Sequence, residues 1–227
     1  VTGRIETIGE IDYFKLDVEA GNVVALELKN DIDDQVVVSI VDDNGSEIEV
    51  NKGAYNSDEY HIGPYDVVTG QTNLYVKINT LNGTGTGSYT LSHEIYESRS
   101  AVTDKIFELT NNERSKVGLP PLTRDPILDS AAYLHSKDMH DNNYYSHTGL
   151  NGSQPTDRAS AVGYEYGVGE NIAKNQISAF NVVEAWMNSW GHRENILRTT
   201  YDEFGTGYFA DESTLWTQKF GNTSIPA

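Results

Sequence analysis

Six histidines are the side chains of this sequence best suited to binding a metal ion or moving a proton near neutral pH. The chain has no cysteine, which excludes thiol catalysis, disulfides and zinc–thiolate centres. It also lacks the His-Glu-x-x-His pattern of zinc metalloproteases and the Gly-x-Ser-x-Gly turn of serine hydrolases. The candidate ligands and bases are therefore His61, His93, His135, His140, His147 and His192.

Two of these histidines belong to one expected helix. His135 and His140 are five residues apart, which separates them around a helix, so they do not form a zinc pair. His135 falls on an apolar stripe, which predicts a buried core histidine with its hydrogen bonds satisfied. Acidic residues at 31–34 and 42–44 carry oxygens that suit calcium, but their spacing is not that of an EF-hand. We interpret both groups as turn residues.

The net charge of the chain limits the classes of molecule that it can bind. Its 34 acidic and 16 basic residues give a net charge of -18. Nucleic acid is excluded as a partner because phosphate recognition needs a basic face, and adhesion to anionic membranes is excluded for the same reason. No apolar run approaches the roughly 18–20 residues of a transmembrane helix. No signal peptide is visible, and we expect any export signal to have been removed before residue 1.

Residues 1–96 have the pattern of short strands. Five segments show either an apolar run or alternation of apolar and polar residues. Turn signals such as Gly21-Asn22 and Asp42–Gly45 lie between them. Short strands at this spacing predict a β-sandwich. The expected strands are residues 13–18, 23–28, 36–41, 74–78 and 88–93.

The pattern becomes helical after a short polar segment at residues 97–101, which we interpret as a linker between two domains. We expect Thr103 or Asp104 to cap the first helix and Gly118 to follow its end. A second helix begins near Asp125-Pro126, and a third spans residues 179–189. Short strands lie between and after the helices, the last at residues 215–220. This mixture predicts an α+β or layered α-β-α domain.

Four features of the first half occur together: an Asp12-Tyr13-Phe14 strand, an Ala20-Gly21 turn, an Asp-x-x-Gly turn at 42–45 and a Gly-x-Tyr-x-Leu strand at 87–91. In this combination residues 1–97 resemble the bacterial pre-peptidase C-terminal domain. That family consists of β-sandwich modules on secreted proteins. The resemblance implies export and a surface role, not chemistry.

A series of short motifs runs through the second half. In chain order they are Asn112-x-Arg114, Gly118–Leu122, His135–Met139, Ser146–Gly149, Gly169–Ala173, Ala185–Leu197, Gly205–Gly207 and Trp216–Gly221. This is the order seen in prokaryotic members of the CAP superfamily of cysteine-rich secretory, antigen 5 and pathogenesis-related proteins. Residues 102–223 are identified as a CAP domain by this resemblance. The resemblance implies an α-β-α sandwich with an open cleft and, since eukaryotic members are stapled by disulfides, a bacterial or archaeal source.

CAP domains line that cleft with two histidines and two acids, and some bind zinc or another divalent ion there. The Ser-His-Thr-Gly motif maps one histidine to His147, and the Gly-Glu-Asn motif maps one acid to Glu170. The prokaryotic Gly-His-Arg motif supplies His192 as the second histidine. The second acid corresponds to about Ser189, which carries no carboxylate. Trp190 also replaces a proline common at that place.

These residues permit a metal site. Neutral imidazoles of His147 and His192 would hold one divalent ion such as zinc, with Glu170 as a third ligand or as the acceptor that fixes an imidazole tautomer. A bound water of lowered pKa would then attack a carbonyl or glycosidic centre. Three structural alternatives stay open: a turn histidine at 147, a capping acid at 170 and a loop-ordering histidine at 192.

Three functions follow. The first is a secreted or cell-surface protein that binds an extracellular ligand in the His/Glu-lined cleft, with or without a divalent metal. The second is a metal-assisted hydrolase acting on cell-wall or peptide substrates. The third is a structural surface or adhesion protein. The partner is an extracellular ligand or cell-surface component, and the sequence leaves the oligomeric state undetermined.

Overall fold

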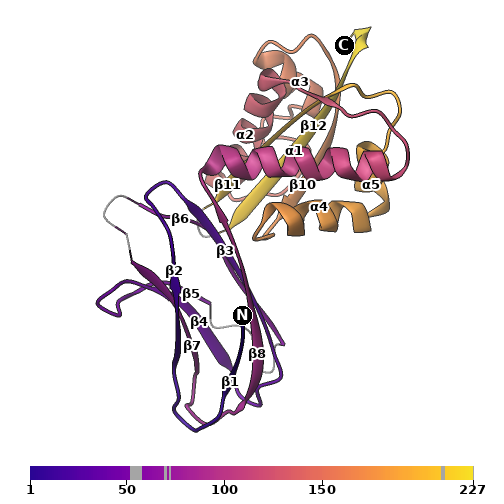
Figure 1. The fold of residues 1–227 in the computed structure, drawn as a ribbon. Coiled ribbons are helices and arrows are strands. Elements are labelled where there is room, and N and C mark those ends of the chain that lie inside the picture. The colour runs from indigo at the N-terminus through magenta and orange to yellow at the C-terminus, as the bar shows by residue number, and fades with distance from the viewer. Residues whose placement is uncertain (52–57, 69–70, 72, 211–212, 227) are drawn as a thin grey trace. The chain divides into compact units, whose positions relative to one another are not determined.

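The computed structural model describes residues 1–51, 58–68, 71, 73–210 and 213–226, with the backbone alone for residues 50, 51, 61 and 224–226. The chain divides into two compact units, Val1–Arg99 and Ser100–Ala227 (Figure 1).

The first unit consists of eight described strands in two antiparallel sheets. One sheet has the order β1-β8-β3-β6 and the other β2-β7-β4-β5. Buried aliphatic residues from both sheets form a single hydrophobic cluster. The strands are β1 (Thr2–Ile5), β2 (Asp12–Leu16), β3 (Val23–Asn30), β4 (Val36–Val41), β5 (Glu47–Asn51), β6 (Glu59–Asp66), β7 (Leu74–Thr80) and β8 (Gly87–Tyr96).

Polar contacts also join these two sheets. The hydroxyl of Tyr89 on β8 donates to the carboxylate of Asp12 on β2. The hydroxyl of Tyr60 on β6 accepts the backbone N–H of Val36 on β4 at 3.2 Å. The aspartate of the Asp-Tyr-Phe segment and the tyrosine of the Gly-x-Tyr-x-Leu segment are therefore paired in space.

The carboxylates of the two acidic groups accept backbone N–H groups. Asp42 accepts the N–H groups of Asn44 and Ser46 at 2.9 and 2.8 Å, so its interpretation as a turn residue is confirmed. Asp31 and Asp33 instead accept the N–H groups of Ser88 and Thr86, which are distant in the chain.

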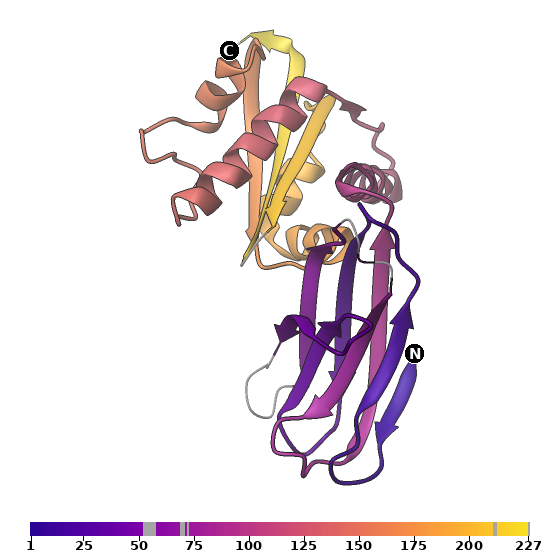
Figure 2. The ribbon, with the colours of Figure 1, turned by 90° about the vertical axis from the view of Figure 1, so that its left-hand side faces the viewer.

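The second unit is a sheet of order β10-β12-β11-β9 between two layers of helices. In Figure 2, α2 and α3 lie on one side of this sheet and α1 and α4 on the other. The elements are α1 (Arg99–Lys116), β9 (Thr123–Arg124), α2 (Pro126–Asp141), α3 (Pro155–Ala161), β10 (Tyr166–Lys174), α4 (Ala179–Asn188), α5 (Trp190–Ile196), β11 (Glu203–Ala210) and β12 (Thr214–Pro226).

The start of α1 differs from the prediction. The helix begins at Arg99, so residues 99–101 belong to it and the expected cap at Thr103 or Asp104 is wrong. The buried positions of α1 recur every four residues from Val102 onward, and the helix begins just before the first of them. Its end is as expected: Gly118 has φ +76°, and the N–H of Leu119 donates to the carbonyl of Arg114 at 3.0 Å.

The second and third predicted helices are confirmed as α2 and α4. Asp125 caps α2, because its carboxylate accepts the N–H groups of Ile127 and Leu128 at 2.8 Å each. The seven-residue helices α3 and α5 were not predicted. Among the helices that the structure describes, none combines the length and the apolar character needed to cross a bilayer.

Two glycines of β11 let α2 lie directly on the sheet. A Cβ atom at Gly205 would come within 2.3 Å of the backbone of Leu128 and Asp129. A Cβ atom at Gly207 would come within 2.3 Å of the backbone nitrogen of Tyr133. Backbone atoms of α2 cannot move aside as the end of a flexible side chain can. The Gly205-Thr206-Gly207 motif therefore sets the distance between α2 and the sheet.

Gly207→Ala is expected to destabilise the second unit by about 1–3 kcal/mol or more, because the added methyl group overlaps the α2 backbone. Gly191→Ala is the control, since a Cβ there meets nothing within 4 Å. All three tryptophans lie in the second unit. Denaturation followed by tryptophan fluorescence therefore reports this unit, and equal midpoints for the two variants would contradict the close contact.

Candidate functional site

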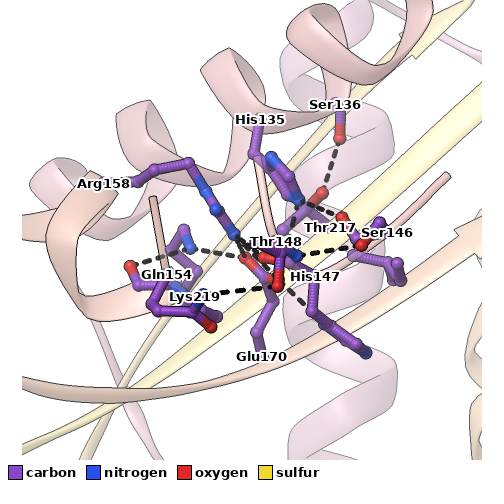
Figure 3. Close-up of polar contacts among 12 residues, drawn as sticks. His135, Ser136, Ser146, His147, Thr148, Gln154, Arg158, Glu170, Thr217 and Lys219 are labelled. Carbon is purple, nitrogen blue, oxygen red and sulfur yellow. Dashed lines mark hydrogen bonds and ion pairs between the residues drawn. The ribbon is translucent and has the colours of Figure 1, made fainter. Parts of the chain in front are cut away.

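The carboxylate of Glu170 is the centre of a buried polar cluster in the second unit (Figure 3). Its side chain is 1% exposed. One oxygen accepts Nδ1–H of His147 at 2.9 Å and Nη2–H of Arg158 at 3.1 Å. The other accepts Nζ–H of Lys219 at 2.6 Å and Nη2–H of Arg158 at 2.9 Å. A carboxylate offers about four lone-pair positions, so these contacts fill its acceptor capacity.

Separate elements supply these groups. Glu170 on β10 lies opposite Lys219 on β12 in the antiparallel register, so both side chains leave the sheet on the same face. Arg158 reaches them from α3, and His147 from the segment between α2 and α3. Arg158 also donates to the backbone carbonyls of His147 and Ser153 at 2.8 Å each. One guanidinium therefore links the carboxylate to the segment that carries the imidazole.

The charges around Glu170 keep it ionised. Burial alone would raise the pKa of its carboxyl group. The hydrogen bond from His147 and the charges of Lys219, His135 and Arg158 outweigh burial and lower that pKa to about 2. An ionised carboxylate only accepts hydrogen bonds, so His147 must donate through Nδ1–H.

His147 thereby presents its other nitrogen outward. Its side chain is 49% exposed, and Nε2 has no hydrogen-bond partner among the described residues. In the neutral ring that carries a proton on Nδ1, Nε2 holds a lone pair. The arrangement supplies a base, an acceptor or a metal ligand of fixed orientation.

His135 is buried behind this contact. Its Nε2 lies 3.1 Å from the carbonyl oxygen of Ser146 and 3.6 Å from a carboxylate oxygen of Glu170. Nε2 therefore carries the proton and donates to Ser146. Nδ1 is buried without a partner, so the prediction of a fully satisfied core histidine is wrong at this atom. Burial, the largest cause, lowers the pKa of His135 to about 4, although the charge of Glu170 opposes the shift.

The opposite face of β10 positions α5. Asn171 donates to the backbone carbonyl of His192 at 3.0 Å and to the amide oxygen of Gln218 at 3.1 Å. Asn195 donates to the side-chain oxygen of Asn171 at 2.9 Å and to the carbonyl of Glu170 at 3.2 Å. Neighbouring residues of the Gly-Glu-Asn motif thus hold the imidazole of His147 on one face and the helix of His192 on the other.

Side chains also occupy the outer edge of β10. The carbonyl of Ile172 accepts from the hydroxyl of Tyr145 at 3.0 Å and from the indole of Trp186 at 3.1 Å. The N–H of Val168 donates to the hydroxyl of Thr156 at 3.2 Å. The N–H of Val168 and the carbonyl groups of Glu170 and Ile172 on this edge are therefore bound by side chains of the same unit.

The three predicted site residues are not equally close. His147 and Glu170 are in direct contact. His192 lies on α5 rather than in a loop, and burial followed by the charge of His147 lowers its pKa. That influence places the two imidazoles within electrostatic reach of each other.

The donor set does not fit a metal centre with three protein ligands. The oxygens of Glu170 are filled by hydrogen bonds from two cationic side chains and His147. The position of the second family acid is Ser189, the residue before α5. Among the described residues, no group of three or more histidine, aspartate or glutamate side chains is arranged to hold a metal ion.

Sequence reasoning missed Arg158 and Lys219 and assigned His135 to the core alone. Arg158 lies on the seven-residue helix α3, and the available signal was the start of that helix, marked by Pro155 in its first turn and by Asp157, which accepts the N–H of Gln154. Lys219 lies in the buried strand β12, where a lysine requires a counter-charge. That requirement was the available signal, but the strand register was needed to identify Glu170 as its partner.

The second unit should lose stability as the pH falls from about 6.5 toward 4. His135 has a pKa near 4 when folded and about 6.5 when unfolded, so the unfolded chain binds more protons in this range. The contribution of neutral His135 to the free energy of unfolding is present above about pH 6.5, and about 2 kcal/mol of that contribution is lost between pH 7 and 5. His135→Gln should remove this part of the loss in denaturation followed by tryptophan fluorescence.

His140→Gln, on the same helix, controls for the loss of a helix histidine. Parallel stability–pH curves for wild type and His135→Gln would contradict the assignment. Glu170, whose folded pKa is about 2, adds a further loss only below about pH 4.5.

Comparisons with known proteins agree with this architecture. The chain is 45% identical over 124 residues to the protein YkwD of Bacillus subtilis, covering 54% of this chain and 48% of the relative. It is 35% identical over 132 residues to the membrane protein YlbC of the same organism, covering 57% and 37%. The chain thus spans half or less of the length of these curated relatives.

A solved structure is also similar. An extracellular protein containing a SCP domain from Bacillus anthracis superposes with a TM-score of 0.51 at 28% identity, covering 67% of this chain and 53% of that chain. The model of the family described as CAP, the cysteine-rich secretory protein family, matches residues 107–220, half of the chain. These residues contain the sheet, the Glu170 cluster and α5, and the chain belongs to the CAP, or cysteine-rich secretory protein, family.

Proposed function

We propose that this CAP protein acts outside the cell, secreted or at the cell surface, and binds an extracellular ligand at the imidazole of His147. The observation that carries the proposal is the bond between His147 and Glu170, which leaves the other ring nitrogen of a half-exposed side chain directed outward. His192, on the neighbouring helix α5, forms the other part of the site. An extracellular location is supported by the similar Bacillus anthracis protein, which is an extracellular protein.

The first unit supports the same location. We propose that residues 1–97 are an accessory β-sandwich of the pre-peptidase C-terminal type and that residues 102–223 form the CAP domain. The support comes from the two antiparallel sheets with a common core and from the pairing of Asp12 with Tyr89. Such a module adds a second surface for contact with a cell-surface component.

Binding is favoured over hydrolysis because Glu170 has no acceptor position left for a substrate or a water. With its pKa near 2, it is also unprotonated at neutral pH and cannot act as a general acid there. The role that its contacts support is to position His147. The remaining reason to test hydrolysis is Nε2 of His147, which is a potential general base.

Binding and hydrolysis are distinguished by one cell-wall experiment. Isolated bacterial peptidoglycan should retain the wild-type chain in co-sedimentation, and His147→Ala should weaken retention at least about tenfold, equivalent to about 1.4 kcal/mol. His140→Ala, which removes a histidine outside the cluster, should bind like the wild type. Equal retention of wild type and His147→Ala would contradict the site.

Release of soluble wall fragments, or of dye from labelled casein, would establish the hydrolase instead if His147→Ala abolished it. The third hypothesis, a structural surface protein, stays a prediction that no specific contact favours. Failure of peptidoglycan to retain any variant would remove the cell wall as the ligand.

A divalent ion such as zinc is a second candidate ligand, favoured by the lone pair on Nε2 of His147 and by the nearness of His192. Two imidazoles would supply the protein donors, and water the rest. We expect zinc calorimetry near pH 7 to show binding much weaker than that of structural zinc sites, and both His147→Ala and His192→Ala to abolish it. Tight binding that survives both substitutions would overturn this assignment.

A further inference from the structure

We propose that Lys219 is a positioning residue that acts through Glu170 on His147. Its ammonium group holds the carboxylate in the orientation that binds Nδ1–H of His147. The inference rests on the proposed role of His147 as the ligand-binding side chain.

The first support is the burial of the ion pair. The side chains of Lys219 and Glu170 are 0% and 1% exposed, and their charged atoms are 2.6 Å apart. A fully buried ammonium and carboxylate are stable only when each has the other or an equivalent partner. The alternative partner of Lys219 is the carbonyl of Pro155, at the longer distance of 3.4 Å. The pairing is therefore required by burial.

The second support is the division of the carboxylate oxygens. Lys219 binds the oxygen that His147 does not bind. Arg158 contacts both oxygens through one nitrogen, at 3.1 and 2.9 Å, and so does not by itself select one orientation of the carboxylate. The ammonium on one side leaves the other oxygen directed at Nδ1. This asymmetry makes Lys219, rather than Arg158, the group that orients Glu170.

The third support is the hydrogen bonding of the neighbouring histidine, His135. Nε2 of His135 lies 3.6 Å from the oxygen that binds His147, but its hydrogen bond goes to the carbonyl of Ser146. His135 therefore does not replace Lys219 as a donor. When Lys219 is removed, the carboxylate loses the contact that holds its second oxygen.

The experiment is ¹⁵N nuclear magnetic resonance of the imidazole nitrogens of the full chain at pH 8, which distinguishes the two neutral tautomers without any ligand. In the wild type His147 should be mainly the tautomer with the proton on Nδ1. Lys219→Met keeps a side chain of similar length without the charge. It should reduce this tautomer at least about threefold relative to the tautomer with the proton on Nε2.

Thr206→Val is the control, because it removes a buried hydrogen bond to the carbonyl of Thr217 in the same sheet without touching Glu170. It should leave the His147 spectrum unchanged. An unchanged spectrum in Lys219→Met, or an equal change in Thr206→Val, would overturn the proposal.

A double-mutant cycle keeps the test valid if Lys219→Met alone does not fold. Glu170→Gln combined with Lys219→Met removes both charges of the buried pair. If Lys219 acts only through Glu170, the double variant should have the His147 spectrum of Glu170→Gln alone. A further shift in the double variant would overturn the proposed route. Because no ligand is present, a negative result here is separable from a failure of His147→Ala to lose peptidoglycan.

Discussion

The charge of Glu170 must be compensated inside the protein, and the arrangement of the second unit around β10 depends on this constraint. A single ionised carboxylate placed between the sheet and a helix layer requires donors from β12, from α3 and from the segment after α2. Leaving such a charge without a partner costs about 3–5 kcal/mol. The electrostatic requirement therefore links segments separated by up to 72 residues in the chain and gives each a defined position.

The two faces of β10 differ in the kind of polar contact that they make. Glu170 gathers charged partners on the face of α2 and α3, whereas Asn171 on the other face contacts the amides of Gln218 and Asn195. Gln218 in turn donates to the hydroxyl of Thr110 on α1. Alternation along a strand places adjacent residues on opposite faces, so one motif connects both helix layers to the sheet. This network of neutral groups holds α5 through Asn171 and Asn195, and the buried guanidinium of Arg114 adds a hydrogen bond to the carbonyl of Ile196 at the end of that helix.

Local patterns made α2, α4 and most strands of the first unit predictable. Asp125-Pro126 marks a helix start through its own hydrogen bonds, and Tyr-Val-Lys-Ile alternates as β7 does. The motifs also identified His147 and Glu170. Arg158 and Lys219 could not be identified, because their role depends on the register of β10 with β12 and on the packing of a seven-residue helix. These are long-range features that no local spacing contains. The start of α1 was misplaced because the helix opens with the polar pair Arg99-Ser100, which has the composition of a linker.

The outer edge of β10 has a consequence for a chain that works at high concentration or in contact with other surfaces. An edge strand with unsatisfied N–H and C=O groups is a template on which a foreign strand can be added. Here side chains of Tyr145, Trp186, Asn195 and Thr156 bind the carbonyl groups of Ile172 and Glu170 and the N–H of Val168. A peptide could therefore add as a strand at the outer edge of β10 only by displacing these bonds, which favours recognition of a bound peptide through its side chains.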